Sequence, residues 1–213
     1  MRLYRLLVLI GVPLRRWCRL QVNGHAVLPP LDAPLLVVSN HDSMLDPLAI
    51  ADTMVRAGRP VRFLAMARLW RHRPIAWVMN GTGQIPIRRG AADAAGLQAA
   101  IDALVAAEAV CIFPEGRLSR GAHVRARSGV ARLIQACPPT TVVLAAVSGG
   151  TDLIRFPRRP MLKVELFAPR ARPGASSETS AEFAQALLDQ IRDRVPPTPA
   201  GRRPHVRDPD AWE

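Results

Sequence analysis

Three polar clusters in this sequence combine residue types that transfer protons or bind phosphate. The first is Asn40-His41-Asp42-Ser43-Met44-Leu45-Asp46, directly after the apolar run Leu35–Val38. An imidazole titrates near neutral pH, and a carboxylate five residues on can orient it and stabilise its protonated form. His41 would then act as a general base toward an attacking alcohol, with Asp46 as its partner. Judged alone, the segment fits more readily a helix start that His41 caps, with Asp46 as a first-turn acid.

The other two clusters also lie beside predicted strands. Gly83-Gln84-Ile85-Pro86-Ile87-Arg88-Arg89 ends in two adjacent arginines, whose guanidinium groups can grip a phosphate. Phe113-Pro114-Glu115-Gly116-Arg117 contains Pro and Gly, which force a sharp turn. This turn would aim Glu115 and Arg117 into the same cleft as His41. By themselves, the second cluster, Gly83–Arg89, fits a solvated strand end, and the third cluster, Phe113–Arg117, fits a surface turn.

Hydrophobic patterning predicts the elements that must position these clusters. Short apolar runs predict strands at 35–38, 61–65, 84–87, 109–113, 142–147 and 162–167. Helical patterns cover 46–57, part of 70–80, 93–108, 128–136 and 180–194. The alternation predicts one α/β domain with a mostly parallel central sheet flanked by helices. In such sheets, sites form beyond the carboxyl ends of the strands, where we expect the three clusters.

The chain divides into three parts. Residues 1–20 are predicted to lie in a membrane interface, because the apolar run Leu6–Leu14 is flanked by Arg and Trp. This run is too short to span a bilayer, which needs about 20 apolar residues. An ordinary first helix packed on the domain is the alternative. Residues 21–194 form the folded domain, and 195–213 a flexible tail rich in Pro and Arg.

Composition favours an anionic partner. The formal net charge is +12, and Lys163 is the only lysine, so nearly all of the positive charge is arginine. Such a surplus suits nucleic acid, an anionic membrane or phosphorylated substrates. Hydrophobic residues make up 49% of the chain, which excludes a disordered protein.

The cysteines and the remaining histidines show no metal-ligand spacing. Cys18, Cys111 and Cys137 are interpreted as reduced thiols of a cytosol-facing protein. The histidines outside the first cluster are interpreted as surface or turn residues: His25, His72, His123 and His205. No metal, nucleotide or redox cofactor is implied.

Together the clusters resemble the glycerolipid acyltransferase family, which contains the bacterial lysophosphatidic acid acyltransferases. His41, four intervening residues and Asp46, preceded by Asn40, match its first block. Phe113–Gly116 matches its third block in full. The remaining matches are Gly83, Ile85, Ile87 and Arg89 in the second block, and Ala145–Gly149 in the fourth. The order and spacing agree over roughly residues 35–170.

The resemblance implies a reaction and roles for individual residues. A fatty acyl group would move from acyl-CoA or acyl-ACP to the free hydroxyl of 1-acyl-sn-glycerol 3-phosphate, giving phosphatidic acid. His41 would be the general base and Asp46 its orienting partner. The head-group site would be shaped by Gly83, Arg89, Glu115, Gly116 and Arg117. The alcohol would attack the thioester directly, and the sequence contains no Gly-x-Ser-x-Gly nucleophile motif.

Four departures from the family pattern leave the acceptor open. Arg117-Leu118-Ser119 replaces the commoner Thr-Arg-Ser and looks more like the acyltransferase half of the bifunctional lysophosphatidylethanolamine enzyme. Met66 replaces a Lys, Arg68 an acidic residue and Leu144 a Pro. Lysophosphatidylethanolamine or a lyso-ornithine lipid are therefore alternative acceptors.

Two alternatives are not enzymes. A nucleic-acid-binding module is disfavoured, because the arginines are spread along the chain and only one Tyr and five Phe are present for stacking. A non-catalytic membrane-binding protein is disfavoured by the intact His41 and Asp46. The expected partners are therefore a lysophospholipid, a thioester donor and an anionic membrane surface, with no nucleic acid. The expected location is the cytoplasmic face of the inner or plasma membrane, as a peripheral or monotopic protein.

Overall fold

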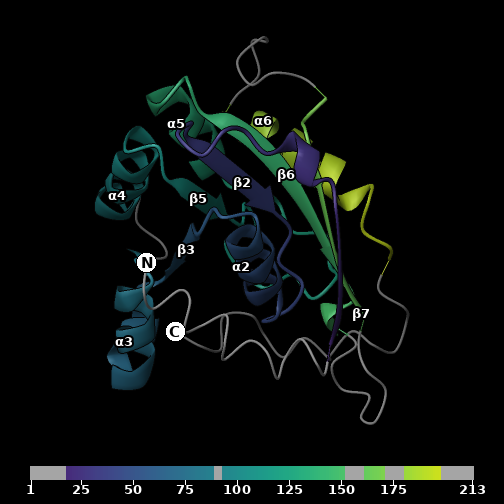
Figure 1. Ribbon diagram of the computed structural model, residues 1–213, viewed down its shortest axis with the longest axis horizontal. Helices are drawn as coiled ribbons and strands as arrows, with labels where there is room; N and C mark the ends of the chain where they lie inside the picture. The colour runs from purple at the N-terminus through teal and green to yellow at the C-terminus, as the bar shows by residue number, and fades with distance from the viewer. Residues whose placement is uncertain (1–17, 89–92, 152–160, 171–179, 198–213) are drawn as a thin grey trace.

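A seven-stranded sheet forms the centre of the molecule (Figure 1). The computed structural model describes residues 18–88, 93–151, 161–170 and 180–197. The strands are β1 (Arg19–Asn23), β2 (Leu35–Ser39), β3 (Val61–Met66), β4 (Ile85–Ile87), β5 (Ala109–Ile112), β6 (Thr141–Ser148) and β7 (Met161–Phe167). The helices are η1 (His25–Val27), α2 (Asp46–Arg56), η2 (Ala67–Arg71), α3 (Arg73–Gly81), α4 (Ala94–Val105), α5 (Gly129–Ala136) and α6 (Ser180–Arg192).

The sheet is mostly parallel, which confirms the predicted α/β class. Its order is β1-β7-β6-β2-β5-β3-β4. The strands from β6 to β4 run parallel to one another, whereas β7 is antiparallel to β6 and β1 is parallel to β7. The carboxyl ends of β2, β3 and β5 therefore lie at the same edge of the sheet.

Strand β1 was not predicted. Its segment Arg19–Asn23 alternates exposed and partly buried residues on the outermost strand, so it shows no apolar run. The strand crosses the predicted boundary at residue 20, which places residues 19 and 20 in the sheet rather than in the N-terminal segment. Residues 1–17 of that predicted membrane-interface segment lie outside the described residues.

Both faces of the sheet are covered. Leu36 and Val38 of β2 face a core built with α4, α5 and α6, whereas Leu35 and Val37 face the core that contains α2. All four side chains are fully buried. Burial on both sides explains why a parallel central strand is a continuous apolar run instead of an alternating one.

The C-terminal end of the fold lies slightly beyond the predicted boundary. Val195 packs against the core, so the fold extends one residue into the predicted tail, whose residues 198–213 lie outside the described part of the chain. Among the described residues, every helix is too short or too polar to cross a bilayer.

Candidate active site

The loop between β2 and α2 carries the first cluster. Asn40 is fully buried and fixes this loop to β6. Its side-chain amide donates to the carbonyl of Val147 at 2.8 Å, and its side-chain oxygen accepts from the Val147 N–H at 2.8 Å. The paired bonds hold the residue before His41 at the carboxyl edge of two neighbouring strands.

His41 and Asp46 face each other, as the spacing predicted. The distance from His41 Nδ1 to Asp46 Oδ2 is 3.5 Å, with 16% of the His41 side chain and 1% of the Asp46 side chain exposed. Asp46 Oδ2 also accepts from the Ser43 N–H at 2.7 Å. Within the described residues His41 Nδ1 has no hydrogen-bond partner, so the two side chains are close without forming a hydrogen bond.

Burial raises the pKa of Asp46, although His41 and the Ser43 N–H act in the opposite direction. An ionised Asp46 is therefore poorly solvated until the imidazole beside it gains a proton. Because Nδ1 of His41 faces this carboxylate, Nε2 is the nitrogen that can exchange a proton with a bound molecule.

Phe113 fixes the plane of the imidazole. Its ring stacks on His41 with centroids 4.3 Å apart and an interplanar angle of 20°. Phe63 stacks on Phe113 from β3, with centroids 6.0 Å apart. The first residue of the third cluster therefore supports the His41 ring by packing against it.

Gly150 is a site residue that sequence reasoning missed. Its carbonyl accepts from Ser43 Oγ at 3.0 Å. A Cβ atom at this position would lie 2.7 Å from Ser43 Cβ and 3.0 Å from Asp46 Oδ1, so only glycine fits. The signal available in the sequence was the second glycine of the Gly149-Gly150 pair, directly after the fourth block.

Arg192, near the end of α6, joins the first and third clusters. Its Nη1 donates to both carboxylate oxygens of Asp42, at 2.9 and 2.8 Å. Its Nη2 donates to Ser119 Oγ at 2.8 Å and to Glu115 Oε1. In addition, the Ser119 N–H donates to the carbonyl of His41 at 2.7 Å. One arginine therefore fixes both loops that flank the imidazole.

The two carboxylates beside Arg192 respond differently to burial. Burial alone would raise the pKa of Asp42, but the Arg192 charge and the donors Ser119 and Gly121 hold that pKa below its usual value. Burial raises the pKa of Glu115, against the opposing charge of Arg192. Glu115 is 1% exposed, and within the described residues its Oε2 has no hydrogen-bond partner. Glu115 therefore faces the protein interior rather than an open head-group site.

The other predicted site residues do not all lie in the same part of the structure. Gly116 has a φ of 65°, and its N–H donates to the Phe113 carbonyl at 3.0 Å, so glycine here makes the turn. Arg117 is exposed on the same turn. Gly83 lies before β4, at the amino edge of the sheet, where its carbonyl accepts from Arg62 Nε at 2.5 Å. The structure therefore does not bring Gly83 to the cluster around His41, and Arg89 lies outside the described residues.

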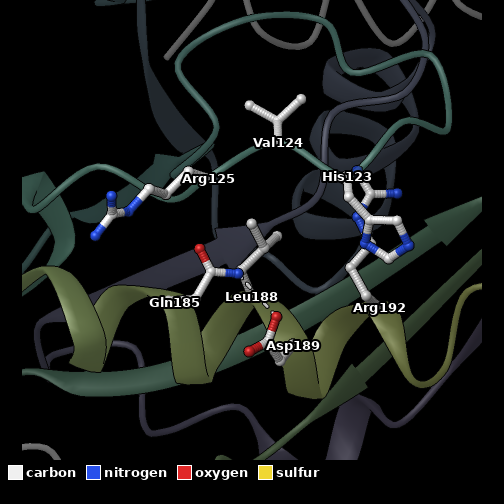
Figure 2. A pocket seen from close by; sticks show the side chains of 7 residues that line it. All are labelled: His123, Val124, Arg125, Gln185, Leu188, Asp189 and Arg192. Atoms are coloured by element: carbon white, nitrogen blue, oxygen red, sulfur yellow. Dashed lines mark hydrogen bonds between the residues drawn. The ribbon is translucent and has the colours of Figure 1, made fainter.

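A cavity of about 210 Å³ lies between α6 and the loop around residues 123–125 (Figure 2). It is lined by His123, Val124, Arg125, Gln185, Leu188, Asp189 and Arg192. Gln185 donates to Asp189 Oδ1 at 2.8 Å along its α6 wall. The cavity lies beside the Arg192 network, and neither His41 nor Asp46 lines it.

The three cysteines are poorly suited to act as nucleophiles. Cys18, Cys111 and Cys137 are all free and buried. Burial raises the pKa of the Cys111 thiol, which makes it a poor nucleophile. Within the described residues, no group of three or more His, Cys, Asp or Glu side chains is arranged to hold a metal ion.

Comparison with known proteins identifies the class. Residues 19–148 match the acyltransferase family, and the chain belongs to that family. It is 28% identical over 104 residues to the chloroplast 1-acyl-sn-glycerol-3-phosphate acyltransferase LPAT1 of Arabidopsis thaliana. That alignment covers 48% of this chain and 28% of the plant protein, so it spans under a third of the relative.

A solved structure shares the fold. The crystal structure of the 1-acyl-sn-glycerophosphate acyltransferase PlsC from Thermotoga maritima superposes with a TM-score of 0.60 at 20% identity. The superposition covers 89% of this chain and 78% of that protein.

Replacing Arg192 tests whether its network holds the site together. Arg192→Ala leaves Asp42 and Glu115 buried without their cation, which should lower the free energy of unfolding by about 3–5 kcal/mol. Urea denaturation measures the loss, with the exposed Arg132→Ala of α5 as the control, expected within about 0.5 kcal/mol of wild type. Equal stabilities of the two variants would show that the network contributes nothing to the fold.

Replacing Glu115 tests its raised pKa. The native protein holds the Glu115 proton more tightly than the unfolded chain does, so this group stabilises the fold fully below about pH 4.3, the ordinary glutamate pKa. That stabilisation is lost as the pH rises through the higher native pKa. Glu115→Gln lacks this loss, so its free energy of unfolding minus that of wild type should rise across that window. A difference that stays flat or falls in denaturation series at successive pH values would refute the assignment.

Proposed function

We propose that this acyltransferase moves a fatty acyl group from acyl-CoA or acyl-ACP to the free hydroxyl of 1-acyl-sn-glycerol 3-phosphate, giving phosphatidic acid. The observation that carries the proposal is the 3.5 Å approach of His41 Nδ1 to the buried Asp46 in a chain of the acyltransferase family. The names of the plant relative and of the structural neighbour support the choice of acceptor.

The reaction needs one proton acceptor and no enzyme nucleophile. His41 Nε2 takes the proton of the acceptor hydroxyl as its oxygen attacks the thioester carbonyl carbon. The tetrahedral intermediate then collapses, the C–S bond breaks, and the thiolate leaves with the proton from His41. Backbone N–H groups stabilise the oxyanion in this mechanism.

Asp46 contributes most when His41 is protonated. Its carboxylate is buried, and burial raises its pKa, so ionised Asp46 is destabilised in the resting site. The imidazolium formed during attack supplies the missing positive charge at 3.5 Å. This interaction is stronger in the transition state than in the ground state, which is the requirement for catalysis.

An exposed arginine near His41 suits a phosphorylated head group. Arg117 is exposed on the turn whose Ser119 holds the His41 carbonyl. We assign phosphate binding to Arg117 and Arg89, because guanidinium groups form bidentate bonds with phosphate. Glu115 supports the site indirectly, through Arg192. Lysophosphatidylethanolamine and lyso-ornithine lipids remain alternative acceptors, and a non-catalytic membrane-binding protein is the alternative of another class.

The proposed location is the cytoplasmic face of the inner or plasma membrane. A lysolipid acceptor resides in or at a bilayer, and a chain with a net charge of +12 is attracted to anionic lipid.

Acyl transfer to a panel of lysolipids tests the reaction. Purified protein with a radiolabelled acyl thioester should label phosphatidic acid, and His41→Ala should lower the rate by at least about 10²-fold. His25→Ala, on the exposed η1, is the matched control and should retain full activity. Label in another phospholipid would change the acceptor and keep the mechanism. No His41-dependent label with either donor would overturn the proposal in favour of a non-catalytic protein.

Removing Arg89 tests the phosphate site. Loss of a charge-assisted pair should raise the KM for the phosphorylated acceptor about tenfold or more, with kcat changed less. The KM for the thioester should stay unchanged, and Arg132→Ala again serves as the control for lost positive charge. An unchanged acceptor KM would remove Arg89 from the site.

A further inference from the structure

The connection between β3 and β4 does not cover the sheet. Its elements η2 and α3, together residues 67–81, are called the η2–α3 unit below. In a parallel crossover the helix ordinarily packs on the sheet. Neither η2 nor α3 contains a buried residue, and Figure 1 shows α3 at the lower left, apart from the sheet.

The centre of helix α3 is nonetheless apolar. Its central residues Ile75 to Met79 form an unbroken apolar run, which places nonpolar side chains around the whole circumference. Ile75 is 38% and Trp77 59% exposed. The apolar face of a helix normally packs against a core or lipid, so the exposed Ile75 and Trp77 lack an apolar covering.

The unit is also strongly basic. It carries Arg68, Arg71 and Arg73, all on the surface, and no Asp or Glu occurs between Asp52 and Asp93. An acidic protein surface would match the charge, but the combination of tryptophan with arginine beside an apolar helix is typical of the lipid interface. These residues therefore favour an anionic bilayer as the surface that the η2–α3 unit contacts.

The position of the unit agrees with this choice. It follows the carboxyl end of β3, the same edge of the sheet at which His41 follows β2. Met44, 67% exposed, lies between His41 and Asp46 in the sequence, and Leu48, 52% exposed, lies two residues after Asp46, so both add apolar surface there. A bilayer contacted by the η2–α3 unit would thus face the edge that carries the active site.

We propose that the η2–α3 unit docks the domain on an anionic phospholipid surface, with Ile75 and Trp77 inserted at the depth of the head groups and Arg71 and Arg73 on lipid phosphates. The proposal deepens the proposed function, because it gives a lipid acceptor a short path to His41. It assigns the contact to the folded domain and adds to any contribution of residues 1–17.

Vesicle flotation of the full chain tests the proposal. Binding to phosphatidylcholine vesicles containing phosphatidylglycerol should exceed binding to phosphatidylcholine alone. The double variant Ile75→Ser/Trp77→Ser should weaken partitioning at least about tenfold, and Arg71→Gln and Arg73→Gln about fivefold each. The matched controls are Val105→Ser, 70% exposed at the end of α4, and the exposed Arg132→Gln. Both controls should bind like wild type.

A fluorescence measurement locates the contact. The triple variant Trp17→Phe/Trp70→Phe/Trp212→Phe keeps Trp77 as its only tryptophan. When this variant is bound to vesicles, bromine on the lipid acyl chains should quench the Trp77 fluorescence. Undiminished flotation of the double variant, or Trp77 fluorescence that bromine does not quench, would overturn the proposal. Docking would then belong to another segment, or α3 would contact a protein partner. Circular dichroism verifies that each variant is folded. Neither readout depends on acyl transfer, so failure of the proposed reaction would be seen separately in the lysolipid panel.

Discussion

Two carboxylates, Asp42 and Glu115, are buried around the single guanidinium group of Arg192. The arrangement is stable only if the charges are nearly matched, since an unpaired buried carboxylate is strongly unfavourable. Arg192 holds the pKa of Asp42 low, whereas burial raises that of Glu115. Asp42 is thus the carboxylate that stays ionised, and Glu115 is the one that keeps a proton to higher pH.

The active site depends on this buried group for its shape. Asp42 directly follows His41, and Ser119 binds both Asp42 and the His41 carbonyl. Phe113, two residues before Glu115, stacks on the imidazole. Movement of α6 would therefore shift His41 and its aromatic support together. In this protein the glutamate of the Phe-Pro-Glu-Gly segment acts on the site through Arg192, and the neighbouring Arg117 is left to face solvent.

The loop that carries His41 is tightly packed, whereas the crossover beside the edge strand β4 is only partly covered. The centre of the sheet is buried on both faces, which fixes β2 and the loop that carries His41. At the outer strands β3 and β4, the crossover helix α3 leaves its apolar residues partly exposed. Under the proposed function, rigid burial suits a proton transfer, which needs ordered groups. The uncovered helix suits the lipid contact that we propose for it.

Local sequence determined most strands, the helices and the closeness of His41 to Asp46. The central strands β2, β5 and β6 are continuous apolar runs, and β3, β4 and β7 were also predictable, while β1 was missed because a half-exposed edge strand carries polar residues. His41 and Asp46 lie five positions apart across a strand-to-helix turn, so their meeting follows from local geometry.

Tertiary structure alone decided the remainder. Arg192 lies 150 positions from Asp42, and the sequence around it resembles any helix end, so its role depends on how α6 packs on the sheet. The sequence placed Gly83 with the site, but the crossover returns it to the amino edge. The helical pattern near residues 70–80 could not reveal whether its apolar side chains are covered. The chemical type of a side chain sets what it can contact. Only the packed fold decides which contacts form, because those contacts join segments far apart in the chain.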